Sequence, residues 1–410
     1  MSAGNGRRVV ASGRGAVASG RRAVAAGLAL VGAATLISAC GIPSRPLWWP
    51  KPKHTTGQAT TGQAAAAGRR PAPRPSPVPV VAHPWHPGLP QLGIDVYWIN
   101  NPRDPADVVA AKARRIINYA ISLDANSIGL SFPFYTYGLT SDTVYADPKT
   151  TPSPASIGIF LAAAQASHIR VTLRPLLNEA SLIAQNPLAW RGSIEPADRS
   201  AWFAGYRALL LRYASVAQAG HAATFVIGTE LDSMQGDPRW PALIRSIQAA
   251  YQGELLYDEN YLAFQDHDAD LPLSTFGVDA YPRFGLSDAA TVGELASAWE
   301  GWLAAHRPSV LKTMVLSEVG IAAVSGAYQV PGDWTQTVNS PIVPVVQTRW
   351  YRAVCRAAAA EHVAGVYWWE ISFDADPAAP AAFQTDRLTF LGRPAQQEIK
   401  TCFARFSPSG

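Results

Sequence analysis

The segment TFVIGTELDSMQGDPRWPALIRSIQAAYQGELLYDEN, residues 224–260, decides the fold. It begins with a short apolar run (224–228), continues into a longer helical pattern (240–252) and ends in a second apolar run (254–258). Both runs are apolar almost throughout, as expected for strands that are covered on both faces. Two such strands joined through a helix predict a parallel pair with a right-handed crossover.

The same alternation continues on both sides of this segment. It predicts further strands at 92–98, 127–132, 170–175, 275–280, 313–318 and 365–370, and helices at about 103–122, 154–167, 199–219, 290–306, 344–362 and 394–402. The connection 259–274 is the weak unit, because it is short and polar. Eight repeats predict an α/β fold, a (β/α)8 TIM barrel forming one domain over 92–410. A doubly wound sheet is the alternative, but no Gly-rich phosphate loop follows the first strand.

The first 91 residues differ in composition from the rest of the chain. Residues 1–40 combine five Arg with an apolar run that ends in Ile37-Ser38-Ala39-Cys40. This is typical of a secretory signal peptide with a lipobox, so we expect lipidation at Cys40; plain secretion is the alternative. Residues 41–91 are rich in Pro, Ala and Gly and predict an extended linker. The signal peptide and the linker together predict that the barrel is held by a lipid on the extracellular face of the membrane, or that it is secreted.

The net charge of +4 arises in this N-terminal part. Residues 1–91 hold eleven Lys and Arg and no acid, whereas residues 92–410 hold 23 basic against 30 acidic residues. A nucleic-acid partner therefore loses its electrostatic support. Because the composition is 48% hydrophobic, one large core is expected. We also expect a monomer.

Polar and aromatic side chains stand at the ends of nearly all the predicted strands. In a barrel these ends converge on the C-terminal face, where active sites of this fold lie. The candidate substrate-binding residues are Asp95, Tyr97, Arg174, Asn178, Glu179, Asn260, Asp279, Tyr281, Trp368, Trp369 and Glu370.

Glu230 and Glu318 stand out among the strand-end residues. They are 88 residues apart, which is about three strand–helix units, so they end the fourth and seventh strands and face each other across the barrel mouth. Cleavage of a glycosidic bond requires two opposed carboxyl groups, one protonated and one ionised. Burial and mutual repulsion would separate their pKa values.

The strand ends GIDVYW, VIGTEL, FGVDAY, LSEVGI and VYWWE resemble those of the clan A glycoside hydrolases, and most closely glycoside hydrolase family 113, the β-mannanase family. This resemblance covers roughly 92–403. It implies that Glu230 is the acid/base and Glu318 the nucleophile of a retaining mechanism. It also implies a hydrogen bond from Tyr281 to the nucleophile, and a sugar platform formed by Trp368 or Trp369. Thr229 departs from the pattern, because many clan A enzymes have Asn before the acid/base.

Several of these residues have structural alternatives. Asp279 and Tyr281 could form a turn, Arg174 could hold Glu179 or Glu230 in a charge network, and Glu370 could support another acid. One of the two tryptophans should pack into the protein, because successive strand side chains face opposite sides.

Cysteine and acidic clusters outside the strand ends allow two further expectations. Cys355 and Cys402 fall on the last two predicted helices and could form a disulfide or remain free thiols. The acidic cluster at 266–270 is interpreted as a solvated loop, since its spacing is not that of a metal site. No cofactor and no metal is implied.

Three functions remain open from the sequence. The first is a retaining glycoside hydrolase that acts on β-linked polysaccharide, either mannan-like or a cell-wall glycan. The second is a non-catalytic glycan-binding lipoprotein on the same scaffold. The third is an envelope transglycosidase with the same two glutamates.

Overall fold

The computed structural model describes residues 78–184, 189–266, 271–306, 308–332, 340–383 and 385–406. The expected signal peptide with Cys40, the first part of the expected linker and residues 267–270 of the acidic cluster lie outside these ranges.

Eight parallel strands close into a barrel within the described residues, and this confirms the TIM-barrel prediction. They are β1 (Gln91–Tyr97), β2 (Ser127–Thr136), β4 (Arg170–Leu177), β5 (Thr224–Thr229), β6 (Glu254–Asn260), β7 (Phe276–Asp279), β8 (Met314–Val319) and β9 (Gly365–Ser372). The order is β1-β9-β8-β7-β6-β5-β4-β2, and the β1–β2 pairing closes the ring. A two-residue strand, β3 (Val144–Tyr145), pairs antiparallel with the end of β2.

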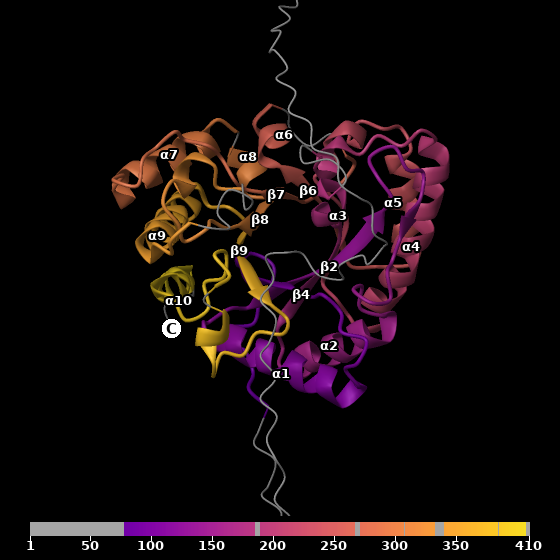
Figure 1. Ribbon diagram of the computed structural model, residues 1–410, viewed down its shortest axis with the longest axis horizontal. Coiled ribbons are helices and arrows are strands. Elements are labelled where there is room, and N and C mark those ends of the chain that lie inside the picture. The colour runs from indigo at the N-terminus through magenta and orange to yellow at the C-terminus, as the bar shows by residue number, and fades with distance from the viewer. Residues whose placement is uncertain are drawn as a thin grey trace, which may run out of the picture. The chain divides into compact units, whose positions relative to one another are not determined.

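Helices surround the strands (Figure 1). The long ones are α1 (Ala106–Ser122), α2 (Pro154–Ala166), α4 (Arg199–Ala219), α5 (Trp240–Gln248), α7 (Val292–Ala304), α9 (Pro344–Glu361) and α10 (Pro394–Phe406). Local sequence fixes their starts: the Asp198 side chain accepts hydrogen bonds from the first turn of α4, and Thr291 with Glu294 forms a capping box on α7. The weak unit contains α6 (Tyr261–Asp266), which is too short for a periodic pattern. Two further short helices are α3 (Glu179–Ile183) and α8 (Pro308–Leu311).

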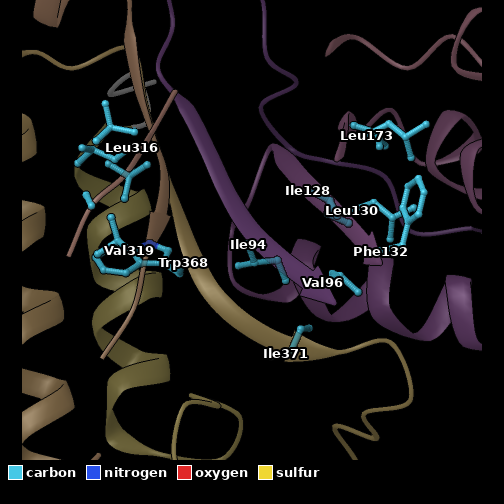
Figure 2. Packing of buried hydrophobic residues seen from close by; sticks show 14 of the residues in the cluster. Ile94, Val96, Ile128, Leu130, Phe132, Leu173, Leu316, Val319, Trp368 and Ile371 are labelled. Carbon is cyan, nitrogen blue, oxygen red and sulfur yellow. The ribbon is translucent and has the colours of Figure 1, made fainter. Parts of the chain in front are cut away.

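The strands present apolar side chains to the helices and polar ones to the barrel interior. Ile94 and Val96 belong to the buried apolar cluster between strands and helices (Figure 2). Asp95 lies between them in the sequence and therefore faces the opposite side, toward the barrel interior. Gly129 on β2 makes room for that carboxyl group, because a Cβ there would lie 1.9 Å from Oδ1 of Asp95. The interior therefore holds ionisable groups directly beneath the C-terminal face.

Residues 78–90 pack against the amino ends of the strands, although the sequence assigned them to the linker. The Val81 amide donates to the carbonyl of Ser167 (3.0 Å), and the Trp85 ring lies 4.7 Å from the guanidinium of Arg170, the first residue of β4. Val81 is buried. The folded domain thus begins by about residue 78 rather than at 92.

A disulfide joins Cys355 on α9 to Cys402 on α10, with Cα atoms 5.7 Å apart. It ties the last helix of the ring to its neighbour. Within the described part of the chain, no helix combines the length and apolar character that crossing a membrane requires.

Candidate active site

Glu230 and Glu318 both lie at the C-terminal ends of barrel strands. Glu230 directly follows β5 and takes a left-handed backbone conformation (φ 49°), with its amide donating to the Asp258 carbonyl on β6. Glu318 is the last but one residue of β8. Both residues are largely buried, at 8% and 5% exposed. The turn after β5 brings the Glu230 carboxyl group to the same end of the barrel as Glu318.

The Glu230 carboxyl group is held from two sides. Asn260 Nδ2 donates to Oε1 at 2.7 Å, and Arg191 Nη1 lies 3.6 Å from Oε2. Burial raises the pKa of Glu230 to about 8; Arg191 opposes this rise, and Glu179 and Glu318 add to it. Glu230 is therefore a carboxyl group that keeps its proton near neutral pH, as a general acid must.

The Glu318 carboxylate has different partners. Arg174 Nη1 donates to Oε1, and the Tyr281 hydroxyl donates to Oε2 at 2.7 Å. The hydrogen bond between Tyr281 and Glu318 is the one that the family resemblance implies. A guanidinium and a phenol therefore both donate hydrogen bonds to this one carboxyl group, one to each oxygen.

Arg174 is the centre of a buried network inside the barrel. Its Nε donates to Asp258 (2.5 Å), and its Nη2 donates to both carboxylate oxygens of Asp279 (2.8 and 2.7 Å). Ser317 donates to the second oxygen of Asp258 (2.7 Å). Burial raises the pKa of Asp258 and, more strongly, of Asp279, with Arg174 opposing in both cases. One guanidinium therefore donates hydrogen bonds to three carboxyl groups, and burial favours protonation of the two aspartates.

A second cation lies in the loop after β4. Arg191 in the 3₁₀ helix η1 (Arg191–Ser193) pairs through Nε with Glu179 (3.3 Å) and through Nη1 with Glu230. Arg191 was not among the residues predicted from the strand ends, because it lies in a loop. The hydrogen bond from Gln235 to Glu259 (2.9 Å) also involves residues that were not predicted.

Tyr97 and Trp369 form an aromatic wall, and Trp369 lies close to Arg174, which donates to Glu318. Their ring centroids are 5.8 Å apart, and Asn178 donates to the Tyr97 hydroxyl (3.2 Å). Trp369 is partly exposed, and the Arg174 guanidinium lies 5.8 Å from its ring. Of the two tryptophans, Trp369 is the one that a sugar in the site can reach.

Five of the proposed substrate contacts are too deeply buried for that role. Asp95, Arg174, Asp279, Trp368 and Glu370 are each at most 2% exposed. Trp368 packs on Tyr351 of α9, with ring centroids 4.5 Å apart, and Figure 2 shows it beside Val319, its partner in register on β8. Alternation along β9 puts it on the helix-facing side. These residues support the site rather than line it.

Arg174, Asn260 and Glu179 also have partners that differ from the expectations. Arg174 holds Glu318 instead of Glu179 or Glu230, because its side chain points into the barrel. Asn260 and Glu179 contact Glu230 and Arg191, respectively. Both residues position charged groups of the site.

Two buried acids have unsatisfied oxygens. Among the described residues, neither carboxylate oxygen of Asp95 has a hydrogen-bond partner, and Oε2 of Glu370 is also without one. Burial raises the pKa of both groups well above the usual range. In the part of the chain that the structure describes, no group of three or more His, Cys, Asp or Glu is placed to hold a metal ion.

Comparison with known proteins gives one family and a set of similar structures. The family profile of Glycoside Hydrolase Family 113 matches residues 107–390. The β-mannanase AaManA of that family from Alicyclobacillus acidocaldarius, in complex with ManMIm, superposes with a TM-score of 0.65 at 19% identity, covering 78% of this chain and 98% of that one. A second β-1,4-mannanase of the family gives 0.62 at 16% identity, with 77% and 99% covered. The search of curated proteins finds no match.

Proposed function

Since the chain belongs to glycoside hydrolase family 113, we propose that it is a retaining enzyme that hydrolyses mannan-like, β-linked polysaccharide. Glu318 attacks the anomeric carbon while Glu230 gives its proton to the leaving oxygen, which forms a glycosyl–enzyme ester and releases the rest of the chain. Glu230, now ionised, takes a proton from water, and the water oxygen displaces Glu318 from the same carbon. Two inversions return the β configuration.

The contrast between the two carboxyl groups carries this proposal. Glu230 accepts from a neutral amide, and burial raises its pKa to about 8, which suits the proton donor. Glu318 accepts hydrogen bonds from a guanidinium and a phenol, one on each oxygen, which hold the carboxyl group in place as a nucleophile. A buried carboxyl group with a raised pKa at the same barrel end as a second carboxyl group is the arrangement expected of the proton donor in a glycosidase pair.

The activity of the two similar proteins supports mannan as the polymer that this chain hydrolyses. Both structures described above are β-mannanases of the same family and superpose along nearly their whole length. Trp369, partly exposed beside Tyr97, offers a flat apolar surface for the C–H face of a pyranose in the reacting position.

Azide rescue tests the assignment. The full-length protein and its Glu318→Ala variant are incubated with an aryl β-mannoside and with β-mannan, with and without azide, and Glu195→Ala serves as the control at an exposed carboxylate. We expect Glu318→Ala to lose activity and to form a glycosyl azide of inverted configuration. Loss of activity without any azide product would contradict the nucleophile assignment.

The same experiment separates the other functions. Wild-type protein that binds β-mannan but cleaves no substrate would indicate a glycan-binding protein. Products longer than the starting oligosaccharide, formed in excess of hydrolysis, would indicate a transglycosidase.

We also propose that the enzyme acts as a monomer, held on the extracellular face of the cell membrane by a lipid on Cys40. The apolar run and the small residues before Cys40 support this location. Metabolic labelling with an alkyne fatty acid should mark the wild-type protein and not Cys40→Ser. Unlabelled wild-type protein in the culture medium would indicate plain secretion instead, and light scattering of the detergent-free enzyme tests the monomer.

A further inference from the structure

Three tyrosines gather at the edge of the active face, on the hairpin formed by the end of β2 and β3. The rings of Tyr137 and Tyr145 stack with centroids 4.6 Å apart, and those of Tyr135 and Tyr145 lie 5.7 Å apart. We call Tyr135, Tyr137 and Tyr145 the tyrosine ledge. Tyr137 is 66% exposed, the highest value among the large hydrophobic side chains of the described residues.

The ledge lies at the C-terminal end of β2, on the same face of the barrel as Tyr97 at the end of β1. Tyr135 lies close enough to Tyr97 to contribute, after burial, to the raised pKa of the Tyr97 phenol. Tyr97 in turn lies 5.8 Å from Trp369. Aromatic rings are therefore found both in the pair Tyr97–Trp369 and, further out at the end of β2, in the tyrosine ledge with the exposed ring of Tyr137.

Hydrogen bonds hold this edge in place. The Thr151 hydroxyl donates to the Pro133 carbonyl (2.7 Å), and the Asn100 amide donates to the Thr150 carbonyl (2.7 Å). The amide of Glu195 donates to the carbonyl of Leu139 (2.7 Å), which joins the hairpin to the loop that carries Arg191. The ledge and the acid/base side of the site are thus parts of one connected edge, and the rings are arranged before a ligand arrives.

The chemistry of the ledge suits a neutral sugar chain. Phenol rings offer flat apolar faces for the C–H faces of pyranoses and hydroxyl groups for their polar edges. Tyr137 stacks on Tyr145, and most of its surface remains in contact with solvent, where a sugar unit can reach it.

From this arrangement we propose that the tyrosine ledge binds sugar units of the β-glycan beyond the one that reacts, and so selects long chains over short ones. This inference rests on the proposed function, because it assigns the ledge to the substrate of the same site. It predicts that efficiency rises with chain length and that the rise depends on the exposed rings.

The test is the ratio of kcat/KM for mannohexaose to that for mannobiose, measured in the full-length protein. Tyr137→Ala and Tyr145→Ala should each lower this ratio by about two- to tenfold, the range expected for one aromatic stacking contact. Tyr137→Phe keeps the ring and should retain most of the ratio. Val80→Ala, an exposed apolar residue near the amino ends of the strands, is the matched control and should leave the ratio unchanged.

Either of two results would overturn the proposal. One is an unchanged ratio in Tyr137→Ala and Tyr145→Ala; the other is an equal loss on both substrates, which would indicate damage to the fold. If the wild-type protein cleaves neither substrate, the proposed function fails by itself. In that case the affinity for mannohexaose, measured by calorimetry, tests whether the ledge binds sugar units. Binding that is weaker in Tyr137→Ala supports the proposal, and absent or unaltered binding contradicts it.

Discussion

The Arg191→Gln variant removes the cation nearest to the proposed acid, Glu230. Arg191 Nη1 lies 3.6 Å from Glu230 Oε2, and both side chains are almost buried. At this distance the attraction is about 1 kcal/mol in bulk water and about 4–5 kcal/mol at an effective dielectric constant of about 20. Because about 1.4 kcal/mol corresponds to one pH unit, loss of the cation should move the pKa of Glu230 upward by about one to three pH units.

The direction of this change can be read from a pH profile. Glu230 must be protonated to act as the acid, so its pKa of about 8 sets the alkaline limb of kcat/KM in the free enzyme. In Arg191→Gln this limb should move to higher pH. The substrate should be an unactivated β-mannooligosaccharide, because an aryl leaving group departs without full help from the acid.

Glu179→Gln is the matched control, for which we expect a shift of the alkaline limb in the opposite direction. Glu179 raises the pKa of Glu230, so its neutralisation should move the alkaline limb to lower pH. Arg191→Gln and Glu179→Gln should both retain cooperative thermal unfolding. A limb that stays fixed in both variants, or moves the same way in both, would refute the electrostatic account of Glu230.

Three other predictions concern the catalytic pair and the last two helices. Tyr281→Phe removes the hydrogen bond to Glu318 and should lower kcat by about 10- to 100-fold with a smaller change in KM, measured by steady-state kinetics. Glu230→Gln should stabilise the protein: because the raised pKa means that the folded state holds the proton more tightly, the wild type loses stability as pH rises from about 4.5 to about 8. The gain in the free energy of unfolding, measured by urea unfolding, should be small near about pH 5 and reach up to about 3 kcal/mol near pH 7. A gain that does not depend on pH would contradict the raised pKa of Glu230 as its cause. Replacing Cys355 and Cys402 together by Ala should lower the free energy of unfolding by about 2–4 kcal/mol, with the kcat of the folded enzyme retained.

The barrel was accessible to sequence reasoning because its units are local. Each apolar run followed by a helical pattern defines one strand and one crossover, as residues 224–260 illustrate. The ends of those strands then locate Glu230 and Glu318, since parallel strands in a closed barrel share one C-terminal face. The exception is α6, whose six residues span too few turns to leave a period in the sequence.

The roles of individual strand-end residues were less accessible, because they depend on contacts across the barrel. Arg174 donates hydrogen bonds to Asp258 and Asp279, which lie on other strands 84 and 105 residues further along the chain. No local sequence pattern specifies such partners. Alternation indicates that Trp368 and Trp369 face opposite sides, but the register of β9 decides which one faces the helices. Arg191 comes from a loop, where neither periodicity nor strand position marks a residue.

The packing of residues 78–90 beneath the barrel gives the molecule two functionally distinct poles. The chain enters at the amino ends of the strands, where Trp85 covers Arg170, and the glutamates stand at the carboxyl ends. Whatever precedes Val78 is therefore joined to the pole opposite the two glutamates. A polymer that reaches the glutamates approaches from the side away from that attachment. Lengthening or shortening the segment before Val78 should change how far the enzyme reaches and leave its orientation toward the polymer unaltered.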